Sequence, residues 1–163
     1  MNREQRRLNA RLARQHKAKK ARATKLGGLA AIGNSLPYAP EEAAKISNEA
    51  RMAWWKMCNG DGSIQSFDEL VYALNTLRIL AEPFDEGVEV VTRAQEALLR
   101  IRQRYLEHGK FGVDAEALRD VPPALDLYDE FLSCATPRMM VNAMTAAVKR
   151  MERARVELIK EVA

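Results

Sequence analysis

The sequence predicts an all-α protein: a four-helix bundle or a compact helical array with a basic N-terminal arm that can be helical. Apolar residues recur at alternating steps of three and four over most of the chain, and no stretch alternates apolar and polar residues as a strand does. Apolar residues make up 47% of the chain and aromatic residues only 6%, with Ala, Leu, Val and Met supplying most of the apolar content. This mixture favours helices over strands.

Charge divides the chain into an arm and a body. Residues 1–25 hold ten Lys or Arg and one Glu, a net charge of +9, whereas residues 26–163 hold 16 Lys or Arg and 21 Asp or Glu, a net charge of −5. The arm lacks proline and strand formers, so it can be helical, but repulsion between its like charges predicts that it is frayed when alone. Residues 26–40, with three glycines and two prolines, form a linker. Residues 41–163 then form the helical domain.

The first helix of the body begins at Pro40, because proline suits the first helical position and the two acids after it suit the positive end of the helix dipole. Adjacent Trp54 and Trp55 point about 100° apart on this helix, so both are hard to bury in one core. We expect one of them in the core, and the other either packed at a helix junction or at an interface, since tryptophan is enriched at binding hot spots. Both are therefore candidate interface residues. Ser66 and Glu69 form a predicted capping box for a second helix over residues 67–82.

Residues 84–108 form the helix on which we expect the rest of the body to pack. Its apolar stripe comprises Val91, Ala94, Leu98, Ile101 and Tyr105. Leu99 and Leu106 widen that stripe enough to receive neighbours on two sides. Glu89 precedes Arg93 by four residues and Glu96 precedes Arg100 by four, the favourable order for ion pairs on a solvated helix surface.

A further apolar stripe begins after Asp114, a capping residue, and keeps its phase through Pro122-Pro123. Two interpretations compete: one kinked helix, or a short helix ending near Asp120 with a new helix starting on the prolines. Proline inside a helix costs about 3 kcal/mol, which favours the restart. Thr136 and Pro137 then open the last helix, which we expect to end at about Val162. Its apolar stripe comprises Met140, Met144, Ala147, Met151, Ala154 and Leu158.

Residues 59–64, NGDGSI, resemble part of a calcium-binding EF-hand loop. In such a loop Met57 would take the first ligand position, where it cannot bind calcium. Asp68 would take the twelfth position, where its side chain is a poor substitute for the bidentate Glu. We therefore expect no tight calcium site and no other metal site.

No catalytic signature occurs, and two histidines, one of them in the arm, give acid–base catalysis little to build on. His108 suits the negative end of its helix. We therefore expect a protein that is not an enzyme and needs no cofactor. Cys58 and Cys134 lack a metal-ligand spacing, and the chain has no signal segment and no run of about 18 apolar residues. These features predict a cytoplasmic protein with two reduced thiols and no membrane partner.

Three segments of the body resemble a set of small, uncharacterised all-α proteins encoded by bacterial phages and mobile elements: LVYALNTLRILAE, RAQEALLRIRQRYLEHGKFGVDAEALRD and LDLYDEFLSCATPRMMVNAMTAAVKRM. The resemblance implies a bacterial cytoplasmic setting and no mechanism. The long basic arm and the Pro122-Pro123 pair depart from the pattern of these proteins.

The arm resembles the arginine-rich RNA-binding motifs of phage antitermination proteins. Arginine neutralises phosphates and adds stacking and bidentate contacts. The candidate nucleic-acid-binding residues are Arg3, Arg6, Arg7, Arg11, Arg14, Lys17, Lys19, Lys20, Arg22 and Lys25, and the first five of them carry the resemblance.

The first functional hypothesis is a phage- or mobile-element-type accessory protein whose arm binds nucleic acid, either RNA or DNA, and whose body binds another protein or itself. One alternative is an inhibitor or adaptor whose arm docks on an acidic protein surface. A third is a structural assembly component. All three require a basic arm and a rigid body, so the sequence leaves them open.

Overall fold

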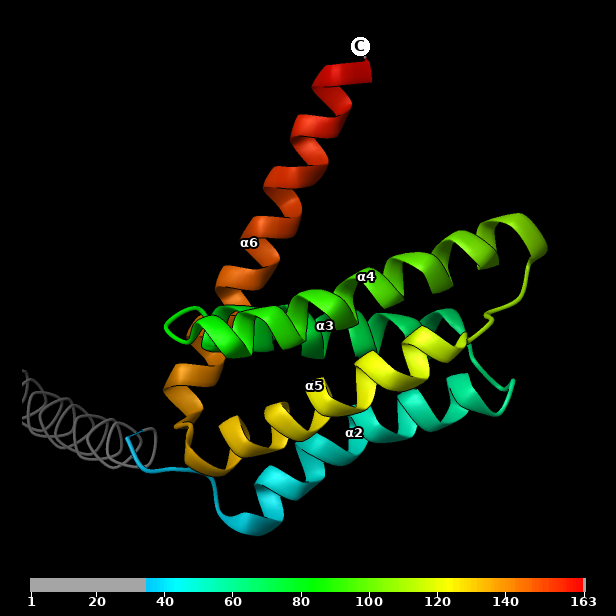
Figure 1. Ribbon diagram of the computed structural model, residues 1–163. Coiled ribbons are helices and arrows are strands. Elements are labelled where there is room, and N and C mark those ends of the chain that lie inside the picture. The colour runs from blue at the N-terminus through cyan, green and yellow to red at the C-terminus, as the bar shows by residue number, and fades with distance from the viewer. Residues whose placement is uncertain (1–34, 163) are drawn as a thin grey trace, which may run out of the picture. The chain divides into compact units, whose positions relative to one another are not determined.

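The computed structural model describes residues 35–162, with side chains described through residue 154. Within this range the chain forms five helices and no strand, which confirms the all-α prediction. The helices are α2 (Pro40–Cys58), α3 (Ile64–Leu80), α4 (Asp85–His108), α5 (Ala115–Cys134) and α6 (Pro137–Val162) (Figure 1). The described body thus has one helix more than a four-helix bundle. The arm and residues 26–34 of the linker lie outside the described residues.

Helix α3, not α4, is the element on which the others pack. It contacts α2, α4, α5 and α6, whereas α4 contacts only α3 and α5 among the described helices. A helix with neighbours on most sides needs apolar or small residues around most of its circumference. On α3 the buried residues are Ser66, Leu70, Ala73, Leu74, Thr76 and Leu77. The expectation that α4 is central was therefore wrong.

Two leucines of α4 were wrongly expected to widen its buried stripe. Leu99 is 64% exposed and Leu106 is 66% exposed, so neither widens the buried stripe. Ala97 completes that stripe instead, beside Ala94 and Leu98. Small alanine side chains allow close approach of a neighbouring helix, and the buried arc of α4 is correspondingly narrow.

The ends of the helices are mostly set by local capping. Helix α3 starts at Ile64, earlier than predicted, because Ser63 is its N-cap and the Ser63 hydroxyl accepts a hydrogen bond from the Ser66 amide at 3.1 Å. The predicted cap at Ser66 is wrong, since this residue is buried in the first turn. Gly109 ends α4 with a φ of 68°, a left-handed conformation that favours glycine. Asp114 caps α5 as expected and accepts from the Ala117 amide at 2.6 Å.

Helix α5 runs without interruption through Pro122 and Pro123, so the favoured restart at the prolines was wrong. The physical reason is packing on both sides of the pair. Val121 and Leu125 are buried in the core, and burying one such side chain stabilises the fold by about 1.5–3 kcal/mol. Keeping both residues on one helical face therefore offsets the backbone cost of the prolines.

Helix α6 packs only against α3 among the described helices, and its C-terminal half extends past the other helices (Figure 1). Its N-cap is Thr136, whose side chain accepts from the Met139 amide at 3.2 Å. The predicted apolar stripe is buried at Met140 and Ala147 but is exposed at Met151 and Ala154. The side chain of the predicted stripe residue Leu158 lies outside the described ones.

Thr76 is a polar exception in the core. Its side chain is fully buried on α3, and its Oγ1 has no hydrogen-bond partner among the described residues. A buried polar group without a partner costs about 1–3 kcal/mol. Thr76 is therefore a weak point in the helix that all the others contact.

Candidate interaction surfaces

The ten basic arm residues predicted to bind nucleic acid lie outside the described residues. Their role stays a prediction from sequence. The candidate surfaces within the described range lie on the body, and one of them includes the two tryptophans.

Trp54 and Trp55 have different environments, as their adjacent positions on a helix require. Trp54 is half-buried and packs against the core, while Trp55 is 55% exposed. Met52, three residues before Trp55 and 51% exposed, lies near it on the outer face of α2. Two large, exposed apolar side chains on one helix face are a feature of protein-binding surfaces. A binding role for either tryptophan stays a prediction.

A shallow depression of about 490 Å³ lies beside Met52. Most of its lining comes from α2, including Lys45, Glu49 and Lys56, and Glu69 contributes from α3. Small-molecule sites are usually enclosed and largely apolar. An open depression lined by charges of both signs is better suited to side chains of a protein partner.

Arg51 fixes helix α2 to helix α5. The Arg51 Nε donates to Asp129 Oδ2 at 2.8 Å, and its terminal NH2 group donates to Asp126 Oδ1 at 2.7 Å and also to Asp129. The Ser47 hydroxyl donates to Asp129 as well. Hydrogen bonds to Asp126 and then Asp129 raise the pKa of Arg51, so the cation is held in place. A signal for this link is present in the spacing of its residues, because Ser47 and Arg51 are four residues apart and Asp126 and Asp129 are three apart.

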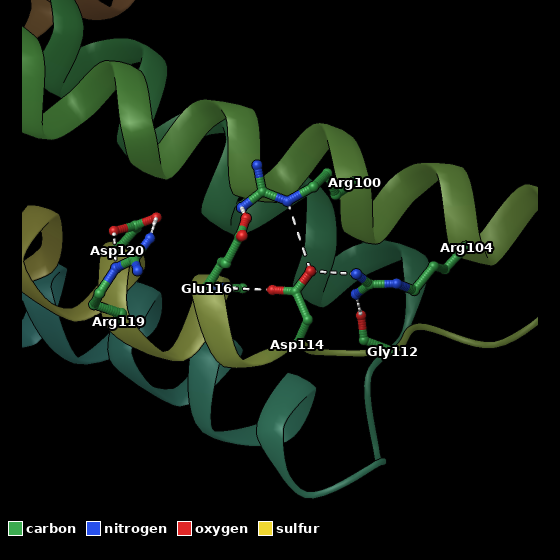
Figure 2. A network of polar contacts seen from close by, with 8 residues as sticks. Arg100, Arg104, Gly112, Asp114, Glu116, Arg119 and Asp120 are labelled. Carbon is green, nitrogen blue, oxygen red and sulfur yellow. Dashed lines mark hydrogen bonds and ion pairs between the residues drawn. The ribbon is translucent and has the colours of Figure 1, made fainter.

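A second polar network joins the end of α4 to the start of α5 (Figure 2). The two terminal nitrogens of Arg104 bind different partners: one donates to the Gly112 carbonyl oxygen at 2.8 Å and the other to Asp114. Arg100 lies 3.1 Å from Glu116 Oε2 and 3.6 Å from Asp114 Oδ2. These are ion-pair distances without hydrogen-bond geometry, since Arg100 Nε and NH2 have no hydrogen-bond partner. The predicted pair of Glu96 with Arg100 is therefore wrong, because the chain turn brings two acids of the next helix closer.

The predicted pair of Glu89 with Arg93 is present, at 2.5 Å. It differs from the Arg100 case because no acid of a neighbouring helix replaces the local partner. The hydrogen bond from Arg104, helped by that from the Ala117 amide, lowers the pKa of Asp114. The hydrogen bond from Arg119 lowers the pKa of Asp120. Asp114 therefore joins the end of α4 to the start of α5, whereas the contact of Arg119 with Asp120 lies within α5.

The loop that resembles an EF-hand serves to end α2. Met57, at the first ligand position, is buried in the core. The Asn59 side-chain amide donates to the Trp55 carbonyl oxygen at 2.8 Å, and Gly60 has a φ of 83°. In the described part of the chain no group of three His, Cys, Asp or Glu is positioned to hold a metal ion. A tight turn explains the residues that a calcium loop would otherwise require.

Cys58 and Cys134 are both free and exposed. Of the described helices, none is both long enough and apolar enough to cross a bilayer.

Comparisons with known proteins found no matching family model, no similar curated protein and no similar solved structure. The resemblances to phage and mobile-element proteins and to arginine-rich motifs stay predictions.

Proposed function

We propose that this chain is a non-enzymatic accessory protein, of the kind found in phages and mobile elements, that binds nucleic acid through its N-terminal arm. The observation behind the proposal is the separation of charge. Residues 1–25 have a net charge of +9 and the rest of the chain has a net charge of −5. A basic segment on an acidic body is typical of proteins that bind a polyanion through that segment.

The physical basis is counterion release. Each phosphate neutralised by Lys or Arg frees a condensed counterion, so the logarithm of affinity falls linearly with the logarithm of salt concentration. The slope is about −0.9 per contact on duplex DNA. If about five of the ten arm cations contact phosphates at once, the expected slope is roughly −4 to −5. The acidic body adds nothing to this attraction on average.

A second candidate function is supported by the outer face of α2. Exposed Met52 and Trp55, beside the charged depression, favour a protein-binding inhibitor or adaptor. In that case the arm docks on an acidic protein surface, and nucleic acid is not the partner.

The test uses full-length protein that has been freed of co-purifying polymer by nuclease treatment. Binding to a duplex DNA and to an RNA hairpin is measured across a salt series. Replacing Arg7, Arg11 and Arg14 with Ala should flatten the slope by about three units if they act as independent phosphate contacts. An arm that recognises one hairpin would instead lose much more affinity for that hairpin than for generic RNA.

The matched control removes the same charge from the body, through Lys56, Arg102 and Lys110 to Ala, all exposed and outside every ion pair in the described part of the chain. This control should keep the wild-type slope. If the wild-type protein fails to bind at low salt, the arm must be assigned to a protein partner, and the candidate surface on α2 becomes the first place to look.

A further inference from the structure

Helix α6 differs in charge from every other described helix. It holds six Lys or Arg against three Glu, a net charge of +3. Helix α2 is neutral, α3 and α4 each have a net charge of −1, and α5 has a net charge of −4. The acidic character of the body therefore stops at α6, which is also the helix that extends past the others (Figure 1).

Three exposed cations of α6 share one face of the helix. Arg138, Asn142, Thr145, Lys149 and Arg153 are spaced at steps of four, three, four and four, and all five are exposed. We call these residues the outer stripe. This spacing places them on one side of a helix, opposite the buried face that packs on α3. The buried residues of that opposite face are Met140, Ala143 and Ala147.

The fold makes no use of the three cations in the outer stripe. Arg138, Lys149 and Arg153 form no ion pair with any described residue, whereas their neighbour Arg150 pairs with Glu82. Elsewhere in the body, Arg51 and Arg104 form ion pairs that join different elements. Glu152 is the one acid near the stripe among residues 137–154 of α6, whose side chains the structure describes.

Arg138 also lies at a helix end where a positive charge is unfavourable. It is the second residue of α6, and the first turn of α6 contains no acid. The N-terminal end of a helix is its positive end, where a cation is unfavourable. Helices α2, α4 and α5 all have acids in their first turns. Helix stability therefore gives no reason for a cation at this position.

We infer that the outer stripe of α6 is a second contact for the phosphate backbone of nucleic acid, separate from the arm. The inference rests on the proposed function, because it assumes the same kind of polyanion. Fifteen residues separate Arg138 from Arg153, and at 1.5 Å per residue they span about 22 Å. One DNA strand advances 3.4 Å per nucleotide, so the stripe spans about six nucleotides. The Asn142 side-chain amide adds a neutral donor, a group that commonly contacts phosphate oxygens, while the Thr145 hydroxyl already donates to the Val141 carbonyl oxygen at 2.7 Å.

The test again uses nuclease-treated, full-length protein, with a duplex DNA and an RNA duplex as probes. The stripe variant replaces Arg138, Lys149 and Arg153 with Ala. Three lost phosphate contacts should flatten the salt slope on duplex DNA by about 2.7 units. A fourfold rise in salt would then weaken binding by the variant about 40-fold less than binding by the wild type.

Two further variants separate charge from folding. The charge-keeping variant, with Arg138→Lys, Lys149→Arg and Arg153→Lys, should retain the wild-type slope. The body control at Lys56, Arg102 and Lys110 should do the same. If the stripe variant keeps the wild-type salt slope, as this control does, the inference is overturned. In that case a flatter salt slope for the arm variant would leave the proposed function standing.

The opposite pattern, in which the stripe variant loses slope and the arm variant does not, supports the stripe and contradicts the arm as the binding segment. Absence of wild-type binding at low salt overturns both. Vesicles of mixed neutral and anionic lipid provide the last comparison. If the stripe substitutions weaken vesicle binding while nucleic-acid binding is unchanged, the stripe is a membrane contact and the inference is wrong.

Discussion

Replacing Thr76 with Val should stabilise the protein, because the Thr76 hydroxyl is buried on α3 without a hydrogen-bond partner among the described residues. The substitution exchanges that hydroxyl for a methyl group at similar volume, and Thr and Val have similar helix propensities. The cost removed is that of a buried, unpaired polar group, about 1–3 kcal/mol. We expect the free energy of unfolding to rise by about that amount.

Urea unfolding of the full-length protein is the appropriate assay. With a urea dependence near 2 kcal/mol per molar, the midpoint should rise by about 0.5–1.5 M while the slope stays unchanged. Thr92 provides the matched control, since its hydroxyl donates to the Val88 carbonyl oxygen at 2.8 Å. Replacing Thr92 with Val should lower stability by about 0.5–1 kcal/mol. Equal effects at the two positions, or a loss of stability from Thr76→Val together with a gain from Thr92→Val, would refute the reasoning from burial and hydrogen bonding.

Three other predictions concern the ends of helices. Ser63→Ala removes the cap of α3 and should lower the free energy of unfolding, measured by heat or urea, by about 1 kcal/mol. A larger loss of stability from Ser66→Ala would instead support the capping box predicted from sequence. Gly109→Ala forces a side chain into a φ of 68° with open space around it, so it should cost about 1–2 kcal/mol through backbone strain alone, and a neutral result would contradict the left-handed cap. The pKa of Asp114 is lowered in the folded protein, chiefly by the hydrogen bond from Arg104, so its stabilising effect is present above the unfolded pKa and is lost as pH falls through the folded one. Arg104→Gln should therefore reduce the loss of stability that is measured as the pH falls below the ordinary Asp pKa of about 3.9, and an unchanged pH profile would show that this carboxyl does not contribute.

The features that sequence predicted correctly depend on neighbours in the chain. Asp114 and Gly109 act on backbone groups within four residues, and the apolar spacing of each helix needs only the helical period. Such signals are complete before any helix meets another, so the all-α class and most helix boundaries follow from them.

The features that sequence missed depend on contacts between helices. Leu99 and Leu106 have the spacing of core residues, but no neighbouring helix covers them. Arg100 forms ion pairs with Asp114 and Glu116 instead of Glu96, because the chain reverses after Gly109 and places these two acids beside α4. The prolines of α5 are accommodated because the core holds residues on both sides of them. Periodicity states which side of a helix is apolar and does not state what lies against it.

Because α6 packs against a single helix, its detachment is the opening that breaks the fewest tertiary contacts. Such an opening would leave α2, α3, α4 and α5 in mutual contact and would uncover Met140, Ala143 and Ala147 together with the face of α3 beneath them. Amide hydrogens of α6 should then exchange with solvent faster than those of α3, whose release requires all of its neighbours to separate. A ligand that binds α6 only in its docked position would slow this exchange, so deuterium uptake along α6 would report on binding at this helix.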